Sequence, residues 1–405
     1  RSGAHAAKAT PFAAARIASR SSGTTRSSGA GRRRKPAIRR TSSADVASIR
    51  PPDEAASADA LRLLDAKTKP PGSLGRLEEL ACRVAGIRSE VPPRPLVPAI
   101  VVAAADHGVA ARNVSAYPRE VTAQMLANFA SGGAAVCVLA REARAKLVVV
   151  DAGVIGGAES AGARSEIVDG VRGTDDLTLG PAMSRSTAIG AIERGIALAG
   201  ELAGDGVAIV GLGEMGIGNT TAASALTAAL LKADVERVCG RGTGLDDEGL
   251  ARKIDAVRRG LTVNGLPNPD AVPADVLAAV GGLEIAFLVG VCLGAAARRL
   301  AILLDGFITS AAGLIAAGMQ PLSAASMIAA TRSPEPGHAL VLEALGLEPL
   351  IDLRLRLGEG TGAALALPLV RSAVAILTGR ATFDSAGVGG RAARLDDAVP
   401  VVADA

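Results

Sequence analysis

Aromatic side chains are almost absent from this chain. It has 405 residues with no Trp and a single Tyr, Tyr117, and aromatic residues make up 1% of it. Apolar residues nevertheless reach 49%, so Ala, Gly, Val and Leu have to fill any core. Side chains of this size suit helices that pack closely on a parallel sheet. The sequence also has no basic face interleaved with aromatic rings, so we expect no nucleic-acid partner.

Histidine and cysteine are also scarce. The three histidines are His5, His107 and His338, and none stands at metal-ligand spacing from Cys, Asp or Glu. The four cysteines are far apart and form no CxxC pair. Each lies among small apolar residues, which is typical of reduced structural thiols. We therefore predict no metal site.

No apolar run is long enough to cross a bilayer. The longest uncharged one, residues 285–297, has 13 residues, whereas a span needs about 20. Glu284 and Asp305 bracket this region closely. In spite of a mean hydropathy of +0.33, we interpret the run as a buried core helix and predict no membrane span.

Acidic residues are missing from the first 44 positions, which hold 11 of the 44 Lys and Arg. Residues 45–405 carry 33 basic and 40 acidic residues, so the body is mildly acidic. Residues 1–50 are rich in Ser, Ala, Arg and Gly and are predicted to be disordered. This composition favours an organelle transit peptide, although a plain disordered tail and a nucleic-acid arm share it. A transit peptide predicts a plastid or mitochondrion as destination; without one, the protein is expected to be cytoplasmic.

Short apolar runs alternate with Ala- and Leu-rich helical patterns in the middle of the chain. Buried strands are predicted at residues 99–104, 146–150 and 207–210. Strands that alternate with helices favour an α/β fold with a parallel sheet covered on both faces. From about residue 320 the pattern is mostly helical, with a predicted helix at residues 363–377.

The most informative stretch is residues 207–226, where a β-branched run, a glycine-rich loop and an apolar helix follow one another. Glycine occupies positions 211, 213, 216 and 218 of the predicted loop. Glycines let the backbone approach a ligand closely, and a helix N-terminus attracts an anion, so a phosphate suits this loop. Glu214 is unusual there, because it places a carboxylate inside an anion cradle.

The same glycines match the pattern G-x-G-x-x-G at residues 211–216, which is a dinucleotide fingerprint. That fingerprint needs an acid at the end of a second strand about 20 residues on. Asp234 and Glu236 stand at this distance but follow a helix, and Glu214 would repel a pyrophosphate. A dinucleotide-dependent oxidoreductase that uses this loop stays open as the alternative function.

A second glycine-rich loop, GEGTG at residues 358–362, precedes the predicted C-terminal helix. Glu359 lies there between two residues without side chains. Poor solvation raises the pKa of such a carboxylate toward the value useful for a general base. An acid that stabilises the helix dipole is the other interpretation, and the loop alone leaves both open.

A third glycine loop, GRGTG at residues 240–244, is followed by Lys253. This lysine is either a point charge that reaches back to a phosphate or an ordinary surface side chain. His107 follows the first predicted strand, where ligands bind in open α/β sheets, but a histidine in this setting is more often a plain loop residue than a catalyst. His338 is given no role. The chain has no Ser/His/Asp arrangement and no P-loop motif, so hydrolase and P-loop kinase functions are excluded.

Many ordered blocks between residues 61 and 388 together carry a specific resemblance. They are TKPPGSLG at 68–75, ADHGV at 105–109, SAYP at 115–118, DAGV at 151–154, GPAM at 180–183, GEMGIGNTT at 213–221, GRGTGLDD at 240–247, GGLE at 281–284, LDGFITS at 304–310, GEGTG at 358–362 and TFDS at 382–385. With these blocks the chain resembles the nicotinate-nucleotide–dimethylbenzimidazole phosphoribosyltransferase family. The resemblance implies transfer of a 5-phosphoribosyl group from nicotinate mononucleotide to 5,6-dimethylbenzimidazole, without metal or cofactor, in cobalamin biosynthesis or salvage.

The resemblance also implies roles for individual residues. The family's catalytic glutamate matches Glu359, and Glu214 matches a second acid of the active site. The phosphate and ribose are expected on Gly216, Gly218, Asn219, Thr220 and Lys253. The benzimidazole is expected near Ser115, Tyr117 and Gln124. A relative that binds nucleotides without catalysis is a third possibility, disfavoured because both glutamates are present.

The family fold implied is a Rossmann-like large domain at residues 95–320 with a small, mostly helical domain built from residues 51–94 and 321–405. A homodimer is implied as well. Two positions depart from the family pattern: Thr331 stands where His is expected, and Asp176 where Asn is usual.

Overall fold

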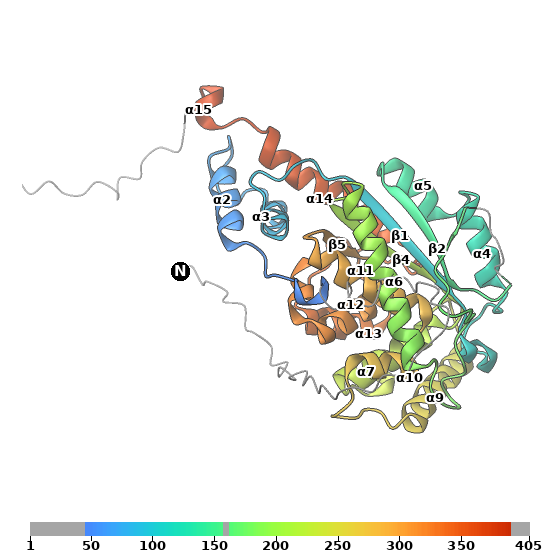
Figure 1. The fold of residues 1–405 in the computed structure, drawn as a ribbon. Coiled ribbons are helices and arrows are strands. Elements are labelled where there is room, and N and C mark those ends of the chain that lie inside the picture. The colour runs from blue at the N-terminus through green and yellow to red at the C-terminus, as the bar shows by residue number, and fades with distance from the viewer. Residues whose placement is uncertain (1–44, 157–161, 390–405) are drawn as a thin grey trace, which may run out of the picture.

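The structure, a computed structural model, describes residues 45–156 and 162–389 (Figure 1). Its strands form one six-stranded sheet in the order β3-β2-β1-β4-β5-β6, and every pairing is parallel. They are β1 (Pro98–Ala105), β2 (Lys146–Gly153), β3 (Arg164–Ser165), β4 (Ile209–Met215), β5 (Ala301–Leu304) and β6 (Met327–Ala329). The predicted α/β fold with a parallel sheet is therefore confirmed, and β1 and β4 lie at its centre.

Strand β1 is buried along its whole length, because both faces of the sheet are covered. Val101 is paired with Val148 of β2, and Val102 with Gly213 of β4. Successive side chains of a strand point to opposite faces. Accordingly, the odd-numbered side chains from 99 to 105 belong to one apolar core, and the even-numbered ones from 100 to 104 to a second.

Each core is completed by helices. The first contains α6 (Arg185–Gly204), α11 (Leu283–Ala297) and α12 (Phe307–Met319). The second contains α3 (Arg76–Arg88), α4 (Val121–Ala130), α5 (Ala135–Glu142) and α14 (Thr361–Gly379). The run at residues 285–297 is confirmed as a core helix, because α11 is buried nearly throughout.

The other helices complete the layers and the connections. They are α2 (Glu54–Asp65), η1 (Gly108–Arg112), α7 (Asn219–Leu231), α8 (Val235–Val238), α9 (Asp247–Val263), α10 (Pro273–Val280), η2 (Pro321–Ser326), α13 (Pro336–Leu345) and α15 (Phe383–Ala386).

The prediction of a loop at residues 211–216 is wrong. Strand β4 continues to Met215 and contains Gly211 and Gly213. Those glycines make room for the start of α14 rather than for a phosphate. A Cβ at Gly211 would lie 3.1 Å from the Cβ of Ala363, and one at Gly213 would overlap the carbonyl of Glu359. Without a loop at these positions, the dinucleotide fingerprint loses its geometry.

The two ends of the described chain pack together (Figure 1), as expected for a unit built from both. Helix α2 packs on α3, and α3 packs on α14. Lys67 forms an isolated bridge with Thr382. Strand β6 lies beyond residue 320 and still belongs to the sheet. The division into a large and a small domain at that residue stays a prediction.

Residues 45–50, which fall in the segment predicted to be disordered, pack against the body. Ile49 is buried, and the carboxylate of Asp45 lies 3.0 Å from the guanidinium of Arg298. Residues 1–44, which carry the transit-peptide prediction, lie outside the described residues.

Two segments of the described chain, Val121–Glu142 and α14, are long and apolar enough by length and composition to cross a membrane. The first consists of two separate helices, α4 and α5. Half of α14 is buried, and it packs on β4 and β5. The core helices of a protein can be equally long and apolar, so these two segments are only weak evidence for a membrane-spanning helix.

Replacement of Gly213 by alanine tests the contact between β4 and the start of α14. The new Cβ would overlap the Glu359 carbonyl, so residues 358–360 would have to move away from the strand. We expect the free energy of unfolding in urea to fall by about 1–3 kcal/mol. Gly204→Ala, at the exposed end of α6 with open space around it, is the matched control and should stay near wild type. Equal stability of the two variants would contradict the contact.

Candidate active site

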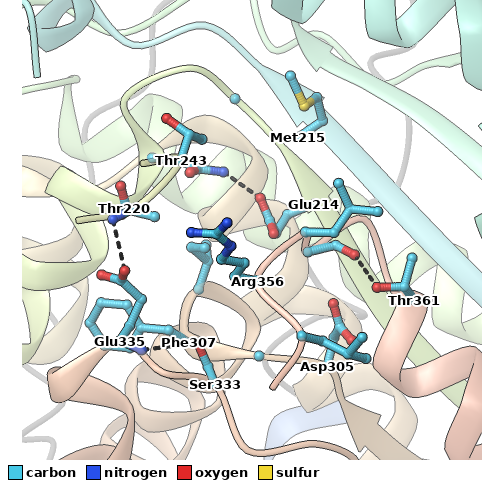
Figure 2. Close-up of a pocket in the computed structure, with 18 of the residues that line it drawn as sticks. Glu214, Met215, Thr220, Thr243, Asp305, Phe307, Ser333, Glu335, Arg356 and Thr361 are labelled. Atoms are coloured by element: carbon cyan, nitrogen blue, oxygen red, sulfur yellow. Dashed lines mark hydrogen bonds between the residues drawn. The ribbon is translucent and has the colours of Figure 1, made fainter. Parts of the chain in front are cut away.

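A pocket lies at the carboxyl ends of β4 and β5, which is where ligands bind in open α/β sheets (Figure 2). Its wall on the β4 side continues into the start of α7, and its wall on the β5 side into the start of α12. Residues 355–358, just before α14, close a third side. The lining residues are Glu214, Met215, Gly216, Ile217, Asn219, Thr220, Gly242, Thr243, Asp305, Gly306, Phe307, Ile308, Thr331, Ser333, Glu335, Leu355, Arg356, Leu357, Gly358 and Thr361.

The turn at residues 358–360 places Glu359 next to this pocket. Gly358, Glu359 and Gly360 have φ values of 77°, 65° and 88°, so three successive residues are left-handed. A glutamate is strained in this conformation, and such strain persists only where the surroundings hold it. Burial raises the pKa of Glu359 to about 7. A carboxyl group with this pKa exchanges protons readily near neutral pH.

Asp305, which directly follows β5, holds the turn in place. Its Oδ2 accepts a hydrogen bond from the backbone N–H of Gly360, and its Oδ1 accepts one from Ala363, each at 3.0 Å. The hydroxyl of Thr361 donates to the carbonyl of Gly358 at 2.8 Å. Asp305 is buried, and burial raises its pKa to about 7. The first turn of α14 is therefore tied directly to the central sheet.

Glu214, the penultimate residue of β4, lies against the same turn. Its Oε2 accepts a hydrogen bond from the side-chain amide of Asn219. A Cβ at Gly358 would overlap its Oε1, and the φ of 77° at this position also favours glycine. Burial, and after it the negative charges of Asp305 and Glu284, raise the pKa of Glu214 to about 8. Both glutamates singled out from the sequence thus belong to one buried acidic group, with Glu214 protonated at neutral pH.

The sequence did not single out Asp305, although it mediates this arrangement. The signal for it was an acid at the end of a short buried strand, followed by glycine and an apolar helix. That pattern resembles the one around Glu214. An acid at the end of a buried strand would therefore have been a usable signal for a site residue.

The residues expected at the phosphate are partly brought together. Gly216, Asn219 and Thr220 line the pocket, and Gly218, with φ 96°, is the N-cap of α7. Asn219 uses its side-chain amide on Glu214 instead of facing an anion. The backbone at the start of α7 remains suited to a phosphate.

Lys253 is buried, so the surface interpretation is wrong. Its Nζ donates to the hydroxyl of Thr220 at 3.1 Å and to the carbonyl of Gly240 at 2.9 Å, and lies 3.8 Å from Glu335. Burial lowers the pKa of this amine. Lys253 therefore stands behind Thr220 and adds positive charge to this end of the pocket.

The residues expected at the benzimidazole lie farther out. Ser115 hydrogen-bonds at 3.2 Å to Thr243, which lines the pocket. Tyr117 and Gln124 are exposed and are not among the lining residues. Their role stays a prediction. The apolar side chains that do line the pocket, which sequence reasoning missed, include Met215, Ile217, Leu355 and Leu357.

His107 and Glu284 form a fully buried pair, with 2.7 Å between Nε2 and Oε1. They lie beneath the loop after β4, since a Cβ at Gly216 would stand 3.1 Å from the ring of His107. His107 is therefore neither a plain loop residue nor part of the pocket lining. His338, which was given no role, accepts a hydrogen bond from the backbone N–H of Ser333.

The two departures from the family pattern have different settings. Thr331 is buried and lines the pocket, and its hydroxyl has no hydrogen-bond partner in the described part of the chain. Asp176 accepts a hydrogen bond at 2.5 Å from Arg112, away from the pocket. Among residues 45–156 and 162–389, no group of three or more His, Cys, Asp or Glu is arranged to hold a metal ion.

Known proteins resemble this chain over most of its length. The pattern of a phosphoribosyltransferase family matches residues 49–388. A nicotinate-nucleotide–dimethylbenzimidazole phosphoribosyltransferase of Chloroflexus aurantiacus is 52% identical over 342 residues, 84% of this chain and 96% of that protein. The enzyme of the same name from Desulforamulus reducens is 49% identical over 346 residues, 85% and 97% of the two chains. The crystal structure of CobT from Thermus thermophilus has a TM-score of 0.78 at 46% identity, and covers 83% of this chain and 99% of that one.

The Asp305→Asn variant tests the anchoring of the turn. The amide can still accept one backbone hydrogen bond, but its NH2 group faces the other backbone N–H, which is left unpaired in a buried place. We expect the free energy of unfolding to fall by about 1–3 kcal/mol. Asp275→Asn, which breaks an exposed ion pair with Arg185, is the control and should change it by less than about 1 kcal/mol. A neutral result at position 305 would show that the turn is held by other contacts.

Proposed function

Because the chain belongs to this phosphoribosyltransferase family, we propose that it transfers the 5-phosphoribosyl group of nicotinate mononucleotide to 5,6-dimethylbenzimidazole. The products are α-ribazole 5′-phosphate and nicotinate, and the reaction serves cobalamin biosynthesis or salvage. One observation carries the proposal for the site: a buried glutamate with a pKa of about 7 lies beside a pocket at the carboxyl end of the sheet, which is lined by glycines and by both apolar and polar side chains.

The leaving group needs no acid from the protein, because the pyridinium nitrogen of the donor already carries a positive charge. The free nitrogen of the imidazole ring attacks C1′ of the ribose with its lone pair, and the bond from C1′ to the pyridinium nitrogen breaks. The bonding electrons return to the pyridine ring, which leaves as nicotinate without further protonation. The alkylated imidazolium then has to lose the proton of its other nitrogen.

Glu359 is the base for that proton. Its ionised form accepts the N–H proton, and a pKa of about 7 keeps a large share of it ionised at neutral pH. A positioned base of this kind contributes on the order of 10²–10⁴-fold to the rate. Glu214, with a pKa of about 8, is protonated under these conditions and supports the base or the ribose as a hydrogen-bond donor.

The two ends of the pocket suit the two substrates. The start of α7 and the buried amine of Lys253 behind Thr220 favour the 5′-phosphate. Met215, Ile217 and Leu357 offer an apolar surface to the acceptor ring. Ser115 and Tyr117, on the loop before α4, and Gln124, in the first turn of α4, complete the acceptor site only if this part of the chain moves inward.

No observation favours the oxidoreductase alternative, because the first two glycines of the fingerprint, Gly211 and Gly213, lie inside β4 instead of in a loop. The presence of Glu214 and Glu359 in one buried group argues against a relative without catalysis.

A homodimer and delivery to a plastid or mitochondrion belong to the same proposal. The family resemblance supports the dimer, and the acid-free, Arg-rich residues 1–44 support the organelle. Without a transit peptide, the protein is expected to work in the cytoplasm.

The reaction itself is tested by the release of nicotinate from nicotinate mononucleotide. We expect release only when dimethylbenzimidazole is added, with α-ribazole 5′-phosphate formed in equal amount. Hydride transfer with bound NAD(H), in the absence of such release, would instead support the oxidoreductase.

Glu359→Gln tests the base. We expect kcat to fall by about 10²–10⁴-fold, while the Kd of nicotinate mononucleotide in calorimetry stays nearly unchanged. For the wild type, kcat should rise with pH up to about 7, where the carboxyl group becomes ionised, and then level off. The variant should lose this rise.

Glu343→Gln, an exposed position on α13, is the matched control and should keep both the rate and the pH profile. Normal turnover of Glu359→Gln, or the same pH profile in that variant, would remove Glu359 from the role of base.

A further inference from the structure

We propose that Arg356 binds the ring carboxylate of the mononucleotide and makes the enzyme select the nicotinate donor over its nicotinamide analogue. The inference rests on the proposed function and adds a specificity-determining residue to it.

Arg356 lies just before the turn at residues 358–360, which carries Glu359, and it lines the pocket. Figure 2 shows its side chain pointing into the pocket, in the space between Glu214 and the side formed by Thr220 and Thr243. Among residues 45–156 and 162–389, its guanidinium has no hydrogen-bond or ion-pair partner, although it stands among acids. A guanidinium that faces a cavity without a partner is available to a ligand.

The acids around it already have partners. Glu214 accepts a hydrogen bond from Asn219, and Asp305 accepts two from the backbone of α14 and the turn before it. Glu335 accepts one from the backbone N–H of Gly242 at 2.8 Å. Arg356 is the Lys or Arg side chain of this lining, and its hydrogen-bonding groups are left for an anionic ligand.

The donor substrate brings two anionic groups into the pocket. Its 5′-phosphate suits the end where Lys253 stands 3.1 Å from the hydroxyl of Thr220. The second anion, the carboxylate on the pyridine ring, needs a cation of its own. Arg356 supplies a second cation at this pocket, and it is carried by the segment that leads into Glu359. One short stretch of chain, residues 356–359, therefore carries both the side chain that binds the leaving ring and the side chain that acts as the base.

The chemistry of arginine matches this group. A guanidinium presents N–H donors in a planar fork that pairs with both oxygens of a carboxylate. A carboxamide carries no charge and offers one oxygen and one NH2, so it cannot form the same pair. Sites built to pair with a polar group discriminate strongly against an analogue that lacks it.

The test compares the two donors in one assay with dimethylbenzimidazole as acceptor. For the wild type we expect kcat/KM for nicotinate mononucleotide to exceed that for nicotinamide mononucleotide by about 30-fold or more. In Arg356→Gln this ratio should fall to within a few-fold of unity, mainly through loss with the acid. Arg356→Lys, which keeps the charge but loses the fork, should give an intermediate ratio. Arg354→Gln, an exposed neighbour outside the pocket lining, should keep the wild-type ratio.

Three outcomes would overturn the inference. An unchanged ratio in both Arg356 variants would mean that the ring carboxylate is bound elsewhere. An equal loss with both donors would assign Arg356 to the phosphate. A wild type that uses both donors equally would show that there is no such selection. Failure of the proposed function is distinct, since the wild type would then release no pyridine from either donor.

Discussion

The candidate site depends on the contact between β4 and the turn at residues 358–360. Gly213 has no side chain, so the carbonyl of Glu359 lies directly against the strand. Asp305 accepts the N–H groups of Gly360 and Ala363 and ties the start of α14 to β5. A left-handed glutamate costs on the order of 1–3 kcal/mol, and these contacts offset that cost. Removal of any one of them frees Glu359 to relax away from the pocket.

The same contacts gather acids in a place with little water. Glu214, Asp305 and Glu359 all have raised pKa values, with burial as the main cause. Each pKa lies above its ordinary value, so each group stabilises the fold at low pH and loses that contribution as the pH rises. For Glu214 the loss runs from about 4.5 to about 8. Burial of these carboxyl groups therefore lowers the stability of the fold near neutral pH, and it holds a proton acceptor beside the substrate pocket.

Much of this arrangement could be predicted from the sequence, and the rest depends on contacts between distant segments. Strands β1 and β2 and the helices α11 and α14 follow from apolar runs, and both glutamates stand out against their glycine neighbours. The continuation of β4 through Gly213 could not be predicted. The strand has glycine there because Glu359, in a turn far along the chain, packs directly against it. Arg356 lies in an alternating Leu-Arg segment that looks like an ordinary exposed stretch. Only the folded chain turns that side chain into the pocket.

The family relationship and the geometry lead to one central claim, that an anchored carboxylate meets the acceptor ring as it displaces the pyridine. The most direct measurement is a crystal structure of the Glu359→Gln variant with nicotinate mononucleotide and dimethylbenzimidazole bound together. The account predicts the side-chain amide of residue 359 about 2.6–3.2 Å from a nitrogen of the benzimidazole, with the turn still bonded to Asp305. A bound acceptor ring whose nitrogens lie beyond the reach of this side chain would contradict it.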